Sequence, residues 1–148
     1  MTFTQSISAD LAAVGLDPAD IERLVSTALA EDLRYGPDAT TAATVPATAV
    51  AVAEMTPRKA GVIAGLPVAL AVFDQVVGAE FRVLDRVDDG THLTPGQPAL
   101  IVRAPVRGLL TAERTALNLL CHLSGVATTT AAWVTEVAGT ACAIRDSR

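Results

Sequence analysis

The 148-residue sequence contains few cysteines, no long apolar run and no excess of positive charge. Although 51% of its residues are hydrophobic, no stretch reaches the roughly 18 uninterrupted apolar residues of a membrane helix. Residues 1–6 lack the basic and then apolar pattern of a signal peptide. The formal net charge of −5 argues against a general nucleic-acid binder. We therefore expect a cytoplasmic globular domain that binds neither membranes nor nucleic acids, with room for a small basic pocket.

Hydrophobic periodicity and turn residues predict an α+β fold. The predicted helices occupy residues 8–14, 18–33, 66–78, 107–125 and 127–137, and residues 40–44 form a turn or a short helix. The predicted strands occupy residues 49–55, 61–65, 81–87, 99–103 and 141–145. The alternation of apolar and polar residues at 81–87 is typical of a half-buried strand. Gly125 is expected to separate the last two helices, and Gly139 to end the second of them.

The helix at 107–125 is almost wholly apolar except along one arc. With residues 100° apart, this arc contains Thr111, Arg114, Thr115, Asn118 and His122. Leucines and alanines fill most of the remaining circumference, as in a helix that is buried by neighbours on nearly every side. A buried helix with one arginine-bearing stripe must direct that stripe toward something polar. The pattern alone leaves open whether this is a structural ion-pair partner or an anionic ligand.

Four other side chains are predicted to be buried. Cys121 and Cys142 are expected to be reduced core residues, because a metal site would need more ligands nearby. Glu113 lies about 100° from Arg114 on the helix, so we expect it to be a buried partner of a backbone or basic group. Trp133, the only tryptophan, is expected to pack in the core.

The end of the sequence indicates a second structural unit. The predicted strand at 141–145 is followed by charged residues, and in α/β folds ligand groups collect after such a strand. A parallel strand also needs neighbours, which no later segment supplies. The sequence therefore looks cut off just after its first barrel-type strand.

Several motifs resemble one known family. The Thr-Ala-Glu-Arg-Thr-Ala-Leu-Asn segment at 111–118 is similar to the signature helix of the quinolinate phosphoribosyltransferases, also called nicotinate-nucleotide pyrophosphorylases (carboxylating). The resemblance continues, in the family's order, at residues 31–33, 38–41, 61–65, 123–128 and 144–148. It therefore covers nearly the whole chain.

The resemblance implies a fold and a domain division. Residues 1–112 correspond to an N-terminal open-faced α/β sandwich, and residues 113–148 to the first helices and first strand of a truncated α/β (TIM-like) barrel. In this family most catalytic groups lie on the barrel. The resemblance therefore predicts that the 148-residue chain alone is inactive.

The resemblance also implies a reaction. Family members convert quinolinate and phosphoribosyl pyrophosphate, with Mg²⁺, into nicotinate mononucleotide, pyrophosphate and CO₂, which feeds de novo NAD synthesis. Arginine forks suit such carboxylate and phosphate groups. By resemblance, Arg148 binds a quinolinate carboxylate in its own subunit, Ser147 stands where the family has threonine, and Arg114 reaches across a homodimer interface into the partner's site. No metal ligand is assigned within the chain, and those for Mg²⁺ are expected on the barrel.

Three other functions are compatible with parts of the pattern. A paralogous phosphoribosyltransferase-like protein of molybdenum transport shares the same helix. A non-catalytic subunit could pair with full-length subunits and donate Arg114. A lipoyl or biotinyl carrier has a similar rhythm of turns at 87–100, but it needs an exposed lysine at a hairpin tip, and residues 81–103 contain no lysine.

Overall fold

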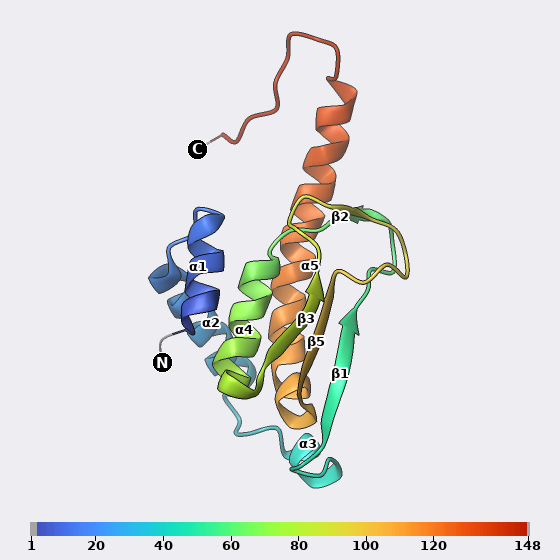
Figure 1. Ribbon diagram of the computed structural model, residues 1–148. Helices are drawn as coiled ribbons and strands as arrows, with labels where there is room; N and C mark the ends of the chain where they lie inside the picture. The colour runs from blue at the N-terminus through green and yellow to red at the C-terminus, as the bar shows by residue number, and fades with distance from the viewer. Residues whose placement is uncertain (1–2, 148) are drawn as a thin grey trace.

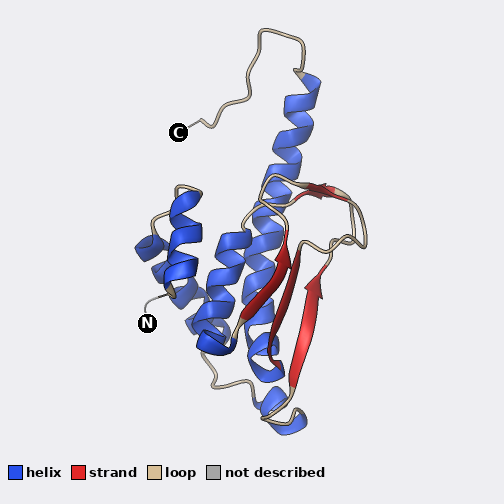
Figure 2. Cartoon of the chain, in the orientation of Figure 1, coloured by secondary structure: helices blue, strands red, loops and turns tan. Residues whose placement is uncertain are grey.

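The computed structural model describes residues 3–147 and combines a small antiparallel sheet with helices on one of its faces (Figures 1 and 2). The helices are α1 (Gln5–Ala13), α2 (Pro18–Asp32), α3 (Ala39–Thr44), α4 (Leu66–Val77) and α5 (Val106–Glu136), with a 3₁₀ turn η1 (Gly78–Glu80) after α4. The strands are β1 (Val50–Met55), β2 (Gly61–Val62), β3 (Arg82–Arg86), β4 (His92–Leu93) and β5 (Leu100–Pro105). The α+β class is confirmed.

The main sheet has the order β1-β5-β3, with both pairs antiparallel. Along the central strand β5, Leu100, Val102 and Ala104 are buried and alternate with more exposed residues, as expected for a strand with one covered face. In the described part of the chain no helix covers the other face, where Val50 and Val52 remain exposed. The open-faced sandwich predicted from the sequence is therefore confirmed.

Strand β3 departs from the sequence prediction. All five residues of Arg82–Arg86 are exposed, so the predicted half-buried strand is wrong in its burial. A register shift between Val83 and Asp85 interrupts its pairing with β5. Such a bulge bends an edge strand and re-aims its side chains, which explains why the alternating sequence does not produce a covered face here.

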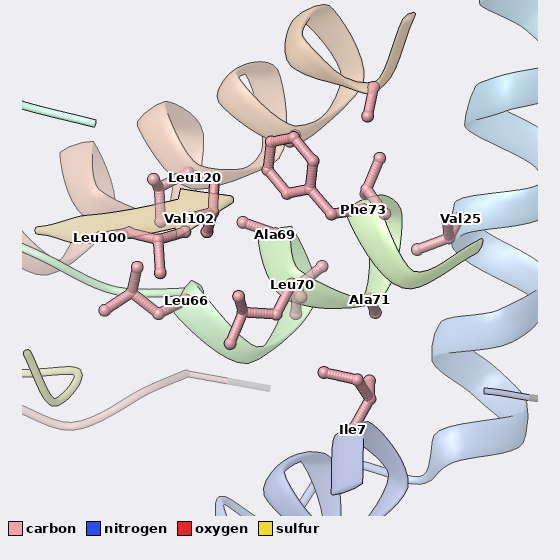
Figure 3. Packing of buried hydrophobic residues seen from close by; sticks show 14 of the residues in the cluster. Ile7, Val25, Leu66, Ala69, Leu70, Ala71, Phe73, Leu100, Val102 and Leu120 are labelled. Atoms are coloured by element: carbon pink, nitrogen blue, oxygen red, sulfur yellow. The ribbon is translucent and has the colours of Figure 1, made fainter. Parts of the chain in front are cut away.

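Helix α4 is the centre of the core (Figure 3). All nine residues from 66 to 74 are buried, because α1 and α2 pack on one side of the helix while α5 and the sheet pack on the others. At its N-terminus the carboxylate of Asp89 accepts hydrogen bonds from the backbone N–H groups of Gly65 (2.7 Å) and Leu66 (3.0 Å). A carboxylate at this position satisfies free amide groups and complements the helix dipole.

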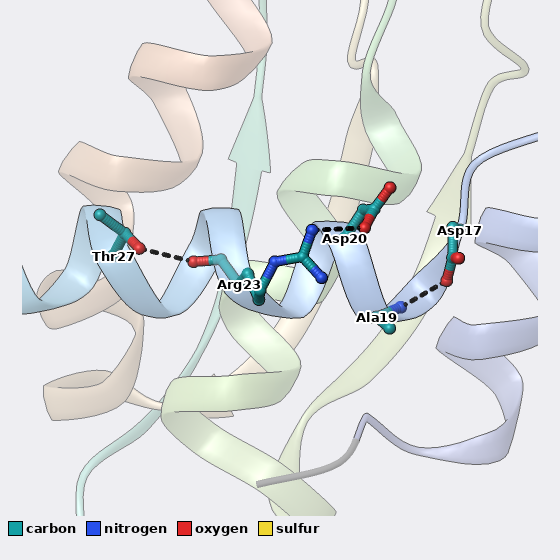
Figure 4. Close-up of polar contacts among 5 residues, drawn as sticks. All are labelled: Asp17, Ala19, Asp20, Arg23 and Thr27. Atoms are coloured by element: carbon teal, nitrogen blue, oxygen red, sulfur yellow. Dashed lines mark hydrogen bonds and ion pairs between the residues drawn. The ribbon is translucent and has the colours of Figure 1, made fainter.

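Helix α2 begins as the sequence predicts (Figure 4). The Asp17 side chain accepts a hydrogen bond from the Ala19 amide at 2.8 Å, and Pro18 occupies the first turn. Ile21, Val25 and Leu29 form the buried stripe of the helix. The helix ends at Asp32, whose position is thus fixed by a packed element.

Helix α5 is continuous over 31 residues, so the predicted break at Gly125 is wrong. Ser124 and Thr128, on either side of this glycine, are both hydrogen-bonded to residues 61–65, the β2 segment, which comprises β2 and the three residues after it. These contacts stabilise α5 on both sides of Gly125, and a single glycine disfavours a helix interior only weakly. The predicted boundary between residues 112 and 113 lies within α5, and it stays a prediction.

The β2 segment runs beside α5 and uses the helix side chains as hydrogen-bonding partners. Thr128 Oγ1 accepts from the Val62 amide at 2.9 Å, and Ser124 Oγ accepts from the Ala64 amide at 3.0 Å. The two glycines of this segment allow the close approach: a Cβ at Gly61 would lie 2.7 Å from Thr128 Oγ1, and one at Gly65 would lie 2.5 Å from Leu123 Cδ1. The contact between the two segments is therefore structural.

The burial of α5 differs from the sequence prediction. Only one stripe is buried in the described chain, formed by Leu109, Ala112, Thr115, Ala116 and Leu120. The predictions for four side chains are wrong, because Glu113, Cys121, Trp133 and Cys142 are all exposed. The second half of α5 extends beyond the sheet, where few elements can cover it (Figure 1).

The predicted strand at 141–145 is also wrong, since these residues have no regular secondary structure. A strand needs a neighbour for its backbone hydrogen bonds, and in the described residues no strand pairs with this segment. None of the helices within residues 3–147 is both long and apolar enough to cross a membrane.

Alanine substitutions at Gly61 and Gly125 test two separate effects of glycine on stability. Gly61 allows the close contact between β2 and α5, and Gly125 lowers the helix propensity of α5. We expect Gly61→Ala to lower the free energy of unfolding by about 1–3 kcal/mol, because its Cβ would overlap Thr128. We expect Gly125→Ala to raise it by about 0.5–1 kcal/mol, because alanine favours a helix interior over glycine and no other side chain or segment lies within 4 Å of the added Cβ. Urea unfolding followed by circular dichroism measures both, and a neutral Gly61→Ala would contradict the close contact.

The exposed apolar residues on the second half of α5 predict self-association. Val126 is 57% and Trp133 is 58% exposed, and Leu123 and Val134 are exposed beside them. Sedimentation velocity over a range of concentrations should reveal species larger than the monomer. The double substitution Val126→Ser, Trp133→Ser should reduce their amount. A concentration-independent monomer would contradict this expectation.

Candidate functional site

The predicted substrate-binding residue Arg114 extends from the first half of α5 toward the end of α2. Its Nε lies 3.4 Å from Asp32 Oδ1. The Arg114 side chain is 76% exposed, whereas that of Asp32 is 22% exposed. The guanidinium group thus lies beside a carboxylate and is accessible to solvent, as a group that binds an anion must be.

Arg114 lies between two cavities. One, of about 330 Å³, is bounded by the end of α2 and by α5, and its lining includes Glu31, Arg34 and Tyr35 as well as Asp32 and Arg114. The other, of about 430 Å³, lies toward α3 and its lining includes Asp32, Asp38 and Arg114. Arg114 and Asp32 are common to both linings. The pair therefore borders both cavities.

The residues of the polar stripe predicted on α5 do not all line the same cavity. Thr115 and Asn118 line the first cavity beside Arg114, and Thr111 lines the second. His122 lies elsewhere, in a shallow hollow with Cys121 and Trp133. The structure thus brings four of the five stripe residues to one region and separates His122 from it.

Arg107, to which the sequence assigned no role, fixes the approach of α3 to α5. Its Nε donates to the Val45 carbonyl and its Nη2 donates to the Ala42 carbonyl, both at 2.9 Å. These acceptors are at the C-terminal end of α3, where helix carbonyls lack intrahelical partners. Arg107 is therefore a structural residue that holds the C-terminal end of α3 against the start of α5.

Asp38 caps α3 at its other end. Its carboxylate accepts hydrogen bonds from the Thr41 hydroxyl and from the Thr41 amide. The Thr41 hydroxyl is the larger cause that lowers the pKa of Asp38 below its ordinary value, and the Thr41 amide adds to the effect. Asp38 therefore remains ionised to lower pH than an ordinary aspartate.

Of the predicted site residues, only Arg114 has a defined site. Ser147 is exposed, lies in a segment without regular structure and lines neither cavity beside Arg114. Arg148 lies outside the described residues. Within residues 3–147 no group of three or more His, Cys, Asp or Glu could hold a metal ion.

The family comparison decides the identity of this domain. Residues 38–124 match the model of the quinolinate phosphoribosyl transferase N-terminal domain. The chain belongs to the quinolinate phosphoribosyltransferase family. The match contains α3, β1 to β5, α4, Arg114 and the first part of α5, whereas α1 and α2 precede it.

Named relatives agree with this assignment. The chain is 60% identical over 125 residues to the nicotinate-nucleotide pyrophosphorylase (carboxylating) of Mycobacterium leprae, an alignment that covers 84% of this chain and 44% of the relative. It is 34% identical over 134 residues to the human enzyme of the same name, covering 84% of this chain and 43% of that one. The chain thus spans less than half the length of these relatives.

Solved structures with a similar fold agree with the family assignment. A crystal structure of NadC from Streptococcus pyogenes superimposes with a TM-score of 0.77 at 39% sequence identity, covering 82% of this chain and 43% of that one. The nicotinate-nucleotide pyrophosphorylase of Francisella tularensis superimposes with a TM-score of 0.72 at 29% identity, covering 80% and 42% of the two chains.

Two motifs that resemble the quinolinate phosphoribosyltransferases have a structural role in this chain. The glycine-bounded segment at 61–65 and the segment at 123–128 contact each other through the hydroxyl groups of Ser124 and Thr128. A third motif, at 31–33, supplies Asp32 to Arg114. The sequence did not predict this ion pair, although it placed Asp32 near the end of a predicted helix.

The Asp38 contact predicts a measurable pKa change. We expect Thr41→Val to raise the pKa of Asp38 toward its ordinary value, because it removes the hydroxyl donor and leaves the amide. Since the folded-state pKa is lowered, the contribution of Asp38 to stability is complete above its unfolded-state pKa and is lost as pH falls through the folded-state value. Carbon-13 NMR titration of the carboxyl group measures the shift. Thr40→Val is the control, and equal Asp38 pKa values in both variants would contradict the assignment.

Proposed function

We propose that this chain provides the N-terminal part of a nicotinate-nucleotide pyrophosphorylase (carboxylating). The reaction is the conversion of quinolinate and phosphoribosyl pyrophosphate into nicotinate mononucleotide, pyrophosphate and CO₂, in cytoplasmic de novo NAD synthesis. The observation that carries the proposal is the family match over residues 38–124, which contains the exposed and tethered Arg114.

Arg114 has the chemistry that this reaction requires of a substrate-binding residue. Quinolinate carries two carboxylates and phosphoribosyl pyrophosphate carries several phosphate oxygens. A guanidinium fork matches both geometries and keeps its charge at any physiological pH. Its proposed contribution is to bind and orient these anions while pyrophosphate leaves, which is positioning and electrostatic stabilisation without covalent chemistry.

We further propose that Arg114 acts across a homodimer interface, in the site of the partner subunit. Its 76% exposure supports this direction, because the described chain does not enclose the guanidinium group. Ser147 and Arg148 are proposed to contribute to the chain's own site. Mg²⁺ is proposed to accompany phosphoribosyl pyrophosphate, with its ligands outside the residues described here.

The molybdenum-transport function gains no support from the comparisons. The Mycobacterium leprae and human relatives are both named nicotinate-nucleotide pyrophosphorylases. A non-catalytic subunit that donates Arg114 to a full-length partner remains a distinct proposal, and it predicts co-purification with such a partner.

The activity test uses the chain alone and a hybrid enzyme. The hybrid consists of this whole chain followed by the part of the Mycobacterium leprae relative that lies beyond the aligned segment. We expect no quinolinate-dependent formation of nicotinate mononucleotide from the chain alone and clear formation from the hybrid. Arg114→Ala in the hybrid should lower kcat/KM about ten- to a hundredfold, the loss expected for a hydrogen bond to a charged group.

Arg23→Ala is the matched control, because Arg23 is exposed on α2 and pairs only with the nearby Asp20 among the described residues. Its kcat/KM should stay within twofold of the unsubstituted hybrid. Product formation by the chain alone would overturn the prediction of inactivity. An inactive hybrid, or one that is insensitive to Arg114→Ala, would overturn the proposed function.

A further inference from the structure

The closest approach between Asp32 and Arg114 is at the Nε atom of the guanidinium group. Asp32 Oδ1 lies 3.4 Å from Nε. This is the shortest distance between the two charged groups, and within residues 3–147 neither Nη1 nor Nη2 of Arg114 donates a hydrogen bond. Arginine has five N–H donors in a rigid planar fork, and its two Nη atoms can bind two oxygens of one carboxylate or phosphate. With the side chain 76% exposed, the two Nη donors are accessible to an anion.

The carboxylate that holds Nε is on a rigid support. Asp32 is the last residue of α2, whose buried stripe packs against α4 and α5 and whose first turn is capped by Asp17. Beyond it, the Leu33 amide donates to the Leu29 carbonyl at 2.9 Å, which closes the helix. The Asp32 side chain is only 22% exposed, although its partner is mostly in solvent. A fixed acceptor can select one orientation of a long and otherwise mobile side chain.

The pair is a weak source of stability. An ion pair with one largely exposed partner contributes about 0–1 kcal/mol to folding. The other cation in the same cavity has a different partner, since the Arg34 guanidinium carbon lies 4.6 Å from the centre of the Tyr35 ring. Arg114 is thus the cation that Asp32 orients, and the main consequence of the pair is the direction of the guanidinium fork.

We propose that Asp32 is a positioning residue for Arg114: by binding Nε, it directs the Nη1–Nη2 edge outward to receive a carboxylate or phosphate of the substrate. This inference rests on the proposed function, because it specifies how the substrate-binding arginine of that function is oriented. Asp32 contacts no substrate itself. Its effect is to reduce the rotamer entropy that Arg114 loses when an anion binds.

The test is a double-mutant cycle in the hybrid enzyme. Asp32→Asn keeps the shape of the side chain and removes its charge. Arg114→Ala identifies the substrate whose KM depends most on Arg114. We expect Asp32→Asn to raise the KM of that substrate about fivefold and to keep kcat within twofold of the unsubstituted hybrid. In the Arg114→Ala background the same substitution should change this KM by less than twofold, because the residue it positions is gone. Asp32→Glu retains a carboxylate. Its increase in log KM should therefore be no more than half of the increase that Asp32→Asn causes.

Asp20→Asn is the matched control. It removes the same charge from the same helix, where Asp20 forms an exposed ion pair with Arg23 at 2.6 Å (Figure 4). Its KM values should stay within twofold of the unsubstituted hybrid. Thermal unfolding of each variant separates a structural loss from a positioning effect, because a positioning residue changes KM without a matching change in the unfolding temperature.

The outcomes separate the two proposals. A hybrid that is sensitive to Arg114→Ala but unaffected by Asp32→Asn would overturn the positioning role and leave the proposed function intact. An Asp32→Asn effect that persists in the Arg114→Ala background would also overturn it, since Asp32 would then act through another group. An inactive unsubstituted hybrid would overturn the proposed function and this inference with it.

Discussion

The burial of α4 is the constraint on which the rest of the structure depends. A helix that is apolar on every side must be covered on every side, and this one is enclosed by the sheet, by α1 and α2, and by α5. Each neighbour can then offer only one face to the core. This explains why the sheet has an open face and why α5 buries a single stripe around Ala112 and Ala116. The surfaces left free are the ones available to ligands and partners.

The position of Arg114 follows from the same packing. Burial of Ala112, Thr115 and Ala116 fixes the rotation of α5 and directs Arg114 away from the core. Packing of α2 against α4 and α5 then brings Asp32 beside it. In the proposed function, a substrate-binding arginine is thus presented by two packed helices and needs no loop to hold it. Positions on rigid elements are the more accurate way to place a binding group.

Local signals predicted much of the fold. Asp17 and Pro18 start α2 as expected, and the strands predicted at 49–55 and 81–87 agree with β1 and β3 to within one residue at each end. The strand predicted at 61–65 is shorter, because β2 ends at Val62, and β4 was not predicted. The errors arose where a residue's environment depends on distant segments. Gly125 does not break α5, because Ser124 and Thr128 are hydrogen-bonded to the β2 segment. Ala64 and Ser124, for example, are 60 residues apart in the sequence. Residues 141–145 have strand-like composition but no pairing strand in the described chain.

The sequence by itself determined the family, the α+β class and Arg114 as the candidate binding residue, because these depend on motif order, periodicity and residue chemistry. Only the tertiary structure placed Asp32 against Arg114 and made Arg107 a structural residue. These contacts join positions 82 and 62 residues apart (114 − 32 and 107 − 45). No local pattern specifies such a pair, since the distance between two side chains is decided by how whole helices pack.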